Sequence, residues 1–161
     1  MNENLTIKKM TADDIEIVYA MHLNNSDNDS EGHVINWLNE TINDPYGYFF
    51  IAYWGDELVG YCGMYHNTLI SNPEILIPDY CKIANIVVKK DFRRQGIGKA
   101  LMLKMIDKAK KLGVDRTKLE VSINNPALKL YESLGFKIEK TEEGFYDDGD
   151  DAYIMWHSSF V

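Results

Sequence analysis

Positive charges and glycines gather in one short stretch, Ile83–Leu101, with the sequence IANIVVKKDFRRQGIGKAL. The apolar run at its start is typical of a buried strand, and a helical pattern follows its end. Glycines at such a junction let the backbone approach a ligand closely, and the unpaired amides of a first helical turn attract anions. The stretch therefore predicts a cradle for a phosphate or pyrophosphate. Its key residues are Arg93, Arg94, Gly96, Gly98 and Lys99.

Two common phosphate-binding patterns do not fit this stretch. A P-loop needs a glycine, then four residues, then Gly-Lys-Ser/Thr, and this pattern is absent. A dinucleotide fingerprint needs a third glycine, whereas Lys99, Ala100 and Leu101 follow Gly98 here. The pattern that fits is Arg93-x-x-Gly96-x-Gly98 after an apolar strand. It resembles the acetyl-CoA signature of the GNAT superfamily of N-acetyltransferases.

A second block, Asn124–Phe136, begins about 25 residues after these glycines and reads N-x-x-A-x-x-L-Y-x-x-x-G-F. Taken singly, Asn124 is explained as a helix N-cap and Tyr131 as an aromatic residue of the core. Both blocks together, in this order and spacing, are similar to the GNAT motifs. The resemblance covers Cys81 to about Met155.

The resemblance implies acetyl-CoA as co-substrate. The strand around Val87 would pair its backbone with the pantetheine arm. The amides from Arg94 to Ala100 would hold the pyrophosphate, and Asn124 would hold the bound cofactor. The implied cofactor-binding residues are Ile86, Val87, Val88, Arg93, Arg94, Gln95, Gly96, Ile97, Gly98, Lys99, Ala100 and Asn124.

It also implies two catalytic residues. Tyr131 would donate a proton to the leaving thiolate. A thiol has a pKa of about 8.5 and a tyrosine of about 10, so this donation is modest but useful. Glu120 stands in a Leu-Glu-Val block similar to one in acetyltransferases of ribosomal-protein N-termini, where the Glu is the proposed general base. A solvent-facing strand Glu is an equally good interpretation of Glu120.

A third block, Gly144–Met155, looks like the Y-x-D-G-E-D-A-Y-x-M segment of protein Nα-acetyltransferases, with Asp150 in place of Glu. The resemblance places Tyr146 at the binding site for the peptide N-terminus. A Gly-Asp hairpin turn between two closing strands explains the same residues and is compatible with that role.

Composition sets the class of protein. A chain of 161 residues is expected to form a single domain, residues 1–161, and its formal net charge of −8 argues against nucleic-acid binding. Cys62 and Cys81 lie in apolar contexts and are expected to be buried thiols of a cytoplasmic protein. We expect no metal, because the histidines are scattered, no membrane span and a monomer or homodimer.

The elements that must position these residues follow from periodicity and turn signals. Strands are predicted at 5–10, 48–54, 58–65, 81–89, 118–123, 136–141 and 152–157. Helices are predicted from Ile15, over 33–43, from Gly96 to Gly113 and over 125–134, the first capped by Thr11 and Asp14. This order predicts an α+β, GNAT-like fold, a mixed and mostly antiparallel central sheet of about seven strands with helices on both faces.

Three functions remain open from the sequence. The first is an acetyl-CoA-dependent N-acetyltransferase that acts on a primary amine, such as a protein N-terminal α-amine. The second is the same chemistry on a small amine, for instance a polyamine, an aminoglycoside or an amino-acid derivative, which the acidic composition favours. The third is a non-catalytic sensor that binds an acyl-CoA; Tyr131 and Glu120 count against it.

Overall fold

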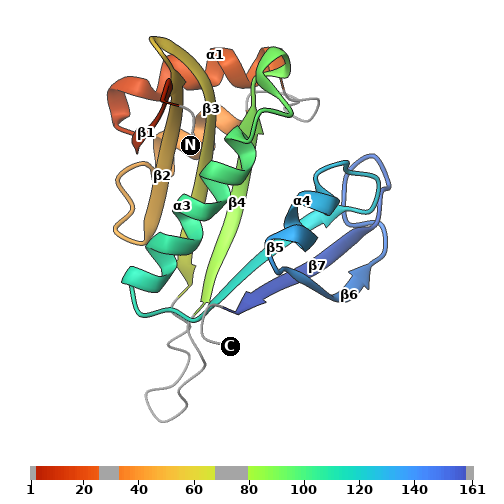
Figure 1. The fold of residues 1–161 in the computed structure, drawn as a ribbon. Helices are drawn as coiled ribbons and strands as arrows, with labels where there is room; N and C mark the ends of the chain where they lie inside the picture. Colours follow the sequence, from red (N-terminus) through yellow and green to blue (C-terminus); the bar gives the residue numbers. More distant parts are fainter. Residues whose placement is uncertain (1–2, 26–32, 68–79, 159–161) are drawn as a thin grey trace. The chain divides into compact units, whose positions relative to one another are not determined.

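The computed structural model describes residues 3–25, 33–67 and 80–158 (Figure 1). Its elements follow the predicted order, and most of the predicted boundaries are correct within two residues. They are β1 (Leu5–Lys9), η1 (Ala12–Asp14), α1 (Ile15–Asn25), α2 (His33–Thr41), β2 (Gly47–Trp54), β3 (Glu57–Asn67), β4 (Tyr80–Val88), η2 (Lys90–Phe92), α3 (Ile97–Lys111), β5 (Arg116–Ser122), α4 (Leu128–Ser133), β6 (Lys137–Glu142) and β7 (Ala152–Ser158).

The strands form a seven-stranded sheet in the order β1-β2-β3-β4-β5-β7-β6. The pairs β1/β2, β2/β3, β5/β7 and β6/β7 are antiparallel, whereas β4 and β5 are parallel at Cys81↔Thr117 and Lys82↔Lys118. The predicted mixed, mostly antiparallel sheet is therefore confirmed. The chain divides into two compact units, unit 1 (Met1–Tyr65 and Ala84–Met105) and unit 2 (His66–Ile83 and Ile106–Val161).

In unit 1, helices α1 and α2 cover one face of β2 and β3. Val18 of α1 and Leu38 of α2 are fully buried against Ile51 of β2 and Tyr61 of β3. Strand side chains alternate between faces, so the same strands turn Phe50 toward the opposite side, where Lys104 of α3 lies over its ring. Helices α1 and α2 therefore lie on one face of this part of the sheet and α3 on the other (Figure 1).

Helix α3 approaches the sheet closely at Gly60. A Cβ atom at this position would lie 3.0 Å from the Val87 carbonyl oxygen and 3.2 Å from Leu101 Cδ1. Ile97 and Leu101 are both buried here, at the first turns of α3. A glycine on β3 thus lets β4 and the start of α3 come together, which sets the place of the predicted cradle.

In unit 2, side chains of β5 alternate strictly between buried and half-buried positions. The buried set includes Leu119, and α4 covers this face, where Phe136 contacts both Tyr131 and His157 through their rings. The half-buried set includes Glu120 and Ser122 and points to the opposite face. The alternation therefore places Glu120 on the face away from α4.

Helix α4 is shorter than predicted. The sequence predicts a helix over 125–134 with Asn124 as N-cap, but the helix spans Leu128–Ser133 and its N-cap is Ala127. The side chain of Asn125 accepts a hydrogen bond from the Ala127 amide at 2.8 Å, and this turn replaces the first helical turn. The N-cap interpretation of Asn124 is wrong.

Other local predictions are confirmed. The Asp14 carboxylate accepts a hydrogen bond from the Thr11 amide at 2.8 Å, as expected of a capping pair. Gly113 ends α3 with a φ of +78°, a conformation that glycine adopts without strain. Cys62 and Cys81 are buried and form no disulfide, and burial raises the pKa of the Cys62 thiol.

Candidate functional site

The predicted cradle lies at the start of α3 in unit 1. Gly96 has a φ of +84°, and its carbonyl oxygen accepts a hydrogen bond from the Ala100 amide at 3.0 Å. The amides of Ile97, Gly98 and Lys99 therefore have no intrahelical acceptor. A Cβ atom built on Gly96 would meet nothing within 4 Å. Three amides at the start of a 15-residue helix and open space above Gly96 fit a diphosphate.

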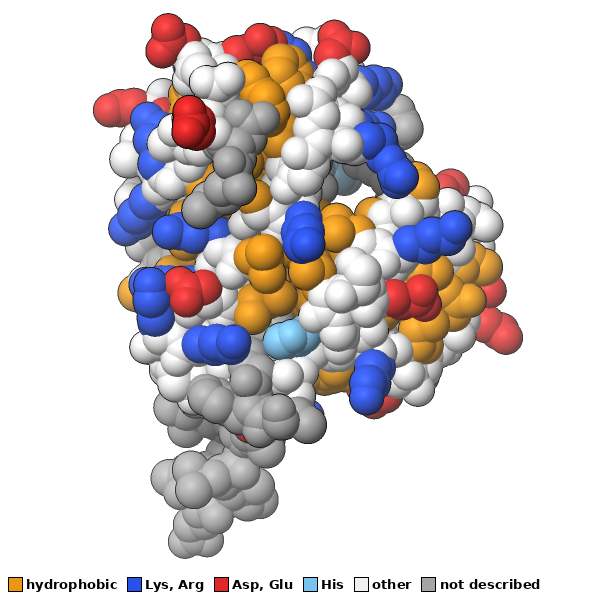
Figure 2. Space-filling model, in the orientation of Figure 1, with side chains coloured by type: hydrophobic (Ala, Val, Ile, Leu, Met, Phe, Trp, Pro, Cys, Tyr) orange, Lys and Arg blue, Asp and Glu red, His pale blue; other side chains and the backbone are white. Residues whose placement is uncertain are grey.

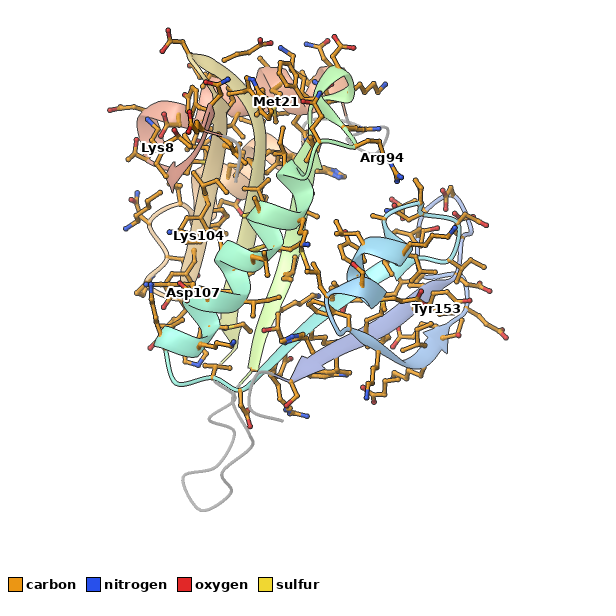
Figure 3. The ribbon with its side chains drawn as sticks, in the orientation of Figure 1. Lys8, Met21, Arg94, Lys104, Asp107 and Tyr153 are labelled. Carbon is orange, nitrogen blue, oxygen red and sulfur yellow. The ribbon has the colours of Figure 1, made fainter. Side chains whose placement is uncertain are left out.

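The charges around the cradle do not all serve it in the same way. Arg94, Gln95 and Lys99 are exposed, and Arg94 has a φ of 65°, which is uncommon for a side chain other than glycine. Figure 3 labels Arg94 on the loop that enters α3. Of the predicted basic side chains, Arg94 of the loop and Lys99 of α3 are thus available to an anion.

Arg93, a predicted cofactor-binding residue, hydrogen bonds to two backbone carbonyls of the protein. Its Nε donates to the Val88 carbonyl oxygen at 3.1 Å, and its Nη2 donates to the Asn25 carbonyl oxygen at 2.7 Å. The Asn25 side chain in turn accepts the Lys90 amide at 2.7 Å. The guanidinium therefore ties the end of β4 to the end of α1. Through these bonds Arg93 shapes the loop that enters the cradle.

The strand before the loop offers little side-chain polarity. Val87 is buried, whereas Ile86 and Val88 are half-buried. The Val87 carbonyl oxygen lies over Gly60. The Val88 carbonyl oxygen accepts a hydrogen bond from Arg93 Nε, and the Lys89 amide donates one to the Val59 carbonyl oxygen at 2.7 Å.

Tyr131 is buried in unit 2, with 6% of its surface exposed. Burial raises the pKa of Tyr131 to about 12, and Tyr146 adds to this shift. The phenol is protonated at neutral pH, as a tyrosine with the ordinary pKa of about 10 also is. A protonated phenol can donate a hydrogen bond or a proton, so Tyr131 has the protonation state that a general acid needs.

Tyr146 lies on the loop between β6 and β7. Burial is the largest cause that raises the pKa of Tyr146, and the negative charges of Glu120, Asp148 and Asp150 raise it further. The backbone of Ser122 lowers this pKa by hydrogen bonding. Tyr146 therefore interacts electrostatically with Glu120 and, separately, with Tyr131.

Glu120 forms two ion pairs. Its Oε2 lies 3.1 Å from Lys82 Nζ, and its Oε1 lies 3.6 Å from Lys118 Nζ. The carboxylate side chain is 12% exposed, which is less than the solvent-facing interpretation predicts. It is not a simple solvent-facing strand residue, and both of its oxygens are engaged by ammonium groups.

Asn124 is exposed, and its backbone amide donates to Ser122 Oγ at 3.2 Å. No hydrogen bond of its side-chain amide is found within residues 3–25, 33–67 and 80–158. The neighbouring Asn125 makes the turn instead. The side chain of Asn124 is thus available to a ligand.

Sequence reasoning missed two positioning residues. Asn25 lies 65 positions from Lys90, and no local pattern connects them. Ser122 is the last residue of β5, where its hydroxyl donates to Asp150 Oδ2 at 2.8 Å. Asp150 stands out in the sequence because it replaces a Glu, but its partner is visible only in the fold.

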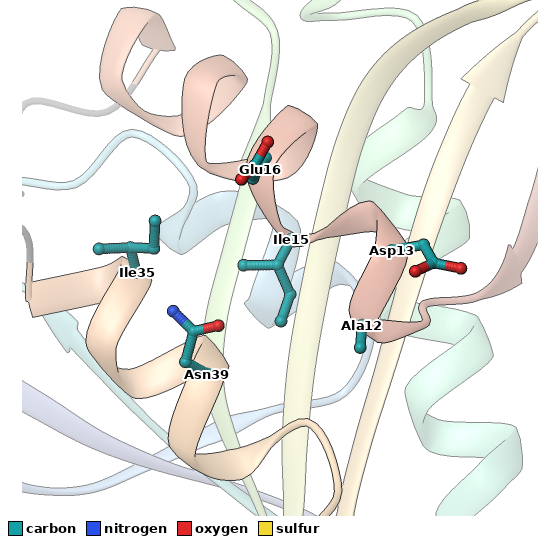
Figure 4. Close-up of a pocket in the computed structure, with 6 residues that line it drawn as sticks. All are labelled: Ala12, Asp13, Ile15, Glu16, Ile35 and Asn39. Carbon is teal, nitrogen blue, oxygen red and sulfur yellow. The ribbon is translucent and has the colours of Figure 1, made fainter.

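A cavity of about 380 Å³ in unit 1 is lined by Ala12, Asp13, Ile15, Glu16, Ile35 and Asn39 (Figure 4). It contains none of the predicted site residues.

Within the described ranges, no three His, Cys, Asp or Glu side chains form a group that could hold a metal ion. Nor is any described helix long and apolar enough to cross a membrane. On the face drawn in Figure 2, basic side chains are interspersed with acidic, polar and hydrophobic ones.

Known proteins resemble this chain in sequence and in fold. The model of the acetyltransferase (GNAT) family matches residues 13–136. A putative ribosomal protein bS18-alanine N-acetyltransferase of Bacillus subtilis is 28% identical over 158 residues, covering 97% of each chain.

Two solved structures share the fold. The ribosomal-protein-S18-alanine N-acetyltransferase of Escherichia coli superimposes with a TM-score of 0.79 at 24% identity, covering 98% of this chain and 95% of that one. Arabidopsis thaliana NAA60 in complex with acetyl-CoA gives a TM-score of 0.81 at 19% identity, covering 96% and 98%. The protein is an acyltransferase with acetyl-CoA as co-substrate. The chain belongs to the acetyltransferase (GNAT) family.

Proposed function

We propose that the protein transfers the acetyl group of acetyl-CoA to the α-amine of a peptide N-terminus. The observation that carries this proposal is the position of Tyr146, whose phenol is electrostatically coupled to Glu120 and to Tyr131. An acceptor amine beside Tyr146 would thus be near a carboxylate and a protonated phenol. The similarity to bS18-alanine N-acetyltransferases supports a peptide as acceptor.

Binding of the co-substrate is assigned to three groups of atoms. The amides of Ile97, Gly98 and Lys99 would hold the diphosphate, with Arg94 and Lys99 adding positive charge. The backbone of Ile86–Val88 would pair with the pantetheine arm. The side chain of Asn124 would hydrogen bond this arm, which supplies the thioester.

Tyr131 is assigned the role of general acid. When the amine attacks the thioester carbonyl, the carbon–sulfur bond breaks and a thiolate leaves. Proton donation from Tyr131 to the sulfur lowers the cost of that charge. A pKa of about 12 makes Tyr131 a weak acid, and it also keeps the proton on the oxygen until the thiolate forms.

Glu120 is assigned the role of general base, because the attacking amine must be neutral. An α-amine has a pKa of about 8 and a lysine of about 10.4, so less work is needed to deprotonate a peptide N-terminus. The ammonium groups of Lys82 and Lys118 compete for the carboxylate. A peptide N-terminus is therefore the acceptor that this carboxylate can deprotonate with the least work.

The experiment is a comparison of acceptors by release of free thiol from acetyl-CoA. Peptides with a free N-terminal Ala, Ser or Met are compared with the same peptides blocked at the N-terminus and carrying an internal Lys. Polyamines and aminoglycosides form a third group. We expect saturable turnover of the free peptides only, with the acetyl group found on the α-nitrogen by mass spectrometry.

The outcomes separate the candidates. Preferred turnover of polyamines or aminoglycosides would replace the peptide with a small amine as substrate. Saturable binding of acetyl-CoA without turnover of any amine would leave the sensor function. We propose a cytoplasmic enzyme, in line with the buried thiols of Cys62 and Cys81, acting as a monomer or homodimer.

A further inference from the structure

The hydroxyl of Ser122 connects two loops of unit 2. Its oxygen donates to Asp150 Oδ2 at 2.8 Å and accepts the Asn124 amide at 3.2 Å. A serine hydroxyl has one donor and two acceptor sites, so both bonds can exist at once. The bond to Asp150 is charge-assisted and is therefore the stronger of the two.

Asp150 closes the turn that carries Tyr146. Its carbonyl oxygen accepts the Tyr146 amide at 3.1 Å, and its own amide donates to Asp148 Oδ1 at 2.9 Å. Gly149, with a φ of +89°, donates its amide to the Tyr146 carbonyl oxygen at 2.9 Å. The backbone of Tyr146 is therefore held from both sides of this short turn.

Ser122 reaches Tyr146 through Asp150. Its hydroxyl donates to the side chain of Asp150, whose backbone carbonyl accepts the Tyr146 amide. The same hydroxyl holds the amide of Asn124. One side chain thus supports a proposed acceptor residue and a proposed co-substrate residue.

We infer that Ser122 and Asp150 form a positioning pair that sets the acceptor-binding place of Tyr146 and joins it to the turn at Asn124. The pair touches neither reactant and acts through these two residues. The inference rests on the proposed function in one respect: Tyr146 must contact the acceptor for the pair to affect the kinetics.

The kinetic test compares Ser122→Ala, Asp150→Ala and the double variant, with acetyl-CoA and the preferred peptide as substrates. We expect each single variant to raise the KM of the acceptor about tenfold, with kcat changed less than about threefold, as for loss of one charge-assisted hydrogen bond. The double variant should be no worse than either single one, because both remove the same contact. Ser122→Thr keeps a hydroxyl and should restore most of the affinity for the acceptor.

The matched control is Ser133→Ala. The Ser133 hydroxyl donates to the Leu130 carbonyl oxygen at 2.6 Å in α4, away from both loops, and its loss should leave the acceptor KM unchanged. An unchanged acceptor KM in Ser122→Ala, a loss confined to kcat, or multiplicative effects in the double variant would overturn the inference.

A second measurement does not depend on catalysis. Hydrogen exchange of the Tyr146 and Gly149 amides should accelerate about tenfold in Ser122→Ala and stay at the wild-type rate in Ser133→Ala. Equal exchange in Ser122→Ala and wild type would refute the positioning pair even if no amine were turned over. Faster exchange without any turnover would support the pair while rejecting the proposed acceptor.

Discussion

The guanidinium of Arg93 donates a hydrogen bond to the backbone carbonyl oxygen of Asn25, 2.7 Å away. This contact joins the loop before α3 to the end of α1, at positions 68 residues apart. The arginine of the R-x-x-G-x-G pattern thus binds protein carbonyls. Its contribution to a bound diphosphate would come from holding the loop in shape.

The first prediction concerns this contact. Arg93→Ala should lower the free energy of unfolding by about 1–2 kcal/mol, because it removes hydrogen bonds from a charged donor. Asn25→Ala should cost about 1–3 kcal/mol, because it leaves the Lys90 amide without its side-chain acceptor. Urea denaturation measures both. Asn25→Ala keeps the backbone carbonyl that accepts Arg93, so only Arg93→Ala reports on this contact, and an unchanged free energy of unfolding in Arg93→Ala would contradict it.

The second prediction separates the cradle from backbone strain. Gly96→Ala and Gly113→Ala both place a side chain at a positive φ, +84° and +78°, with nothing within 4 Å of the new Cβ atom. Each should therefore cost about 1 kcal/mol of stability. Only Gly96→Ala adds an atom above the free amides of α3, so only this variant should weaken acetyl-CoA binding, by about tenfold or more in calorimetry. Equal affinities in the two variants would remove the diphosphate from this helix start.

The third prediction concerns Tyr131 as the acid. Tyr131→Phe should reduce kcat by about 100-fold, within the range of general acid catalysis, with little change in the KM of acetyl-CoA. Single-turnover measurements of thiol release test the chemical step directly. A rate equal to that of the wild type would exclude Tyr131 as the proton donor.

The fourth prediction follows from the raised pKa of the same residue. A tyrosine ionises near pH 10 when unfolded, whereas folded Tyr131 keeps its proton to about pH 12. Between these values the unfolded state has lost a proton that the folded state retains, so stability decreases as pH rises above 10. Tyr131 alone should contribute a slope of about 1.4 kcal/mol per pH unit. Denaturation at pH 9, 10 and 11 should show this part of the slope missing in Tyr131→Phe, and parallel profiles would contradict the shift.

The fifth prediction distinguishes two roles of Glu120. If it is the base, Glu120→Gln should reduce kcat/KM at least tenfold at pH 7, and the deficit should shrink as pH passes the pKa of the α-amine, about 8. If its ion pairs with Lys82 and Lys118 are its only role, the deficit should be independent of pH. Stability should change by less than about 1 kcal/mol in either case, because both lysines are partly exposed. Lys82→Met serves as control, since it breaks one pair and keeps the carboxylate.

The local elements were predictable because their signals lie within a few residues. The Thr11–Asp14 pair, the strand at β5 and the glycine at the end of α3 are all predicted from short-range patterns, and each is confirmed. The start of α4 was not predicted correctly, since the Asn125 side chain competes with the backbone for the amide of Ala127. Such competition depends on side-chain geometry that periodicity does not contain.

The sequence by itself determined the order of strands and helices, the glycine-bearing start of α3 and the membership in the GNAT family, because short-range spacing carries this information. Only the tertiary structure decided the partners: Asn25 for Arg93, two lysines for Glu120, and Asp150 for Ser122. Apart from Lys118, which lies on β5 together with Glu120, each partner comes from a different segment of the chain than the residue that it contacts. The formation of these contacts depends on packing and register, which bring distant side chains within hydrogen-bonding or ion-pairing distance.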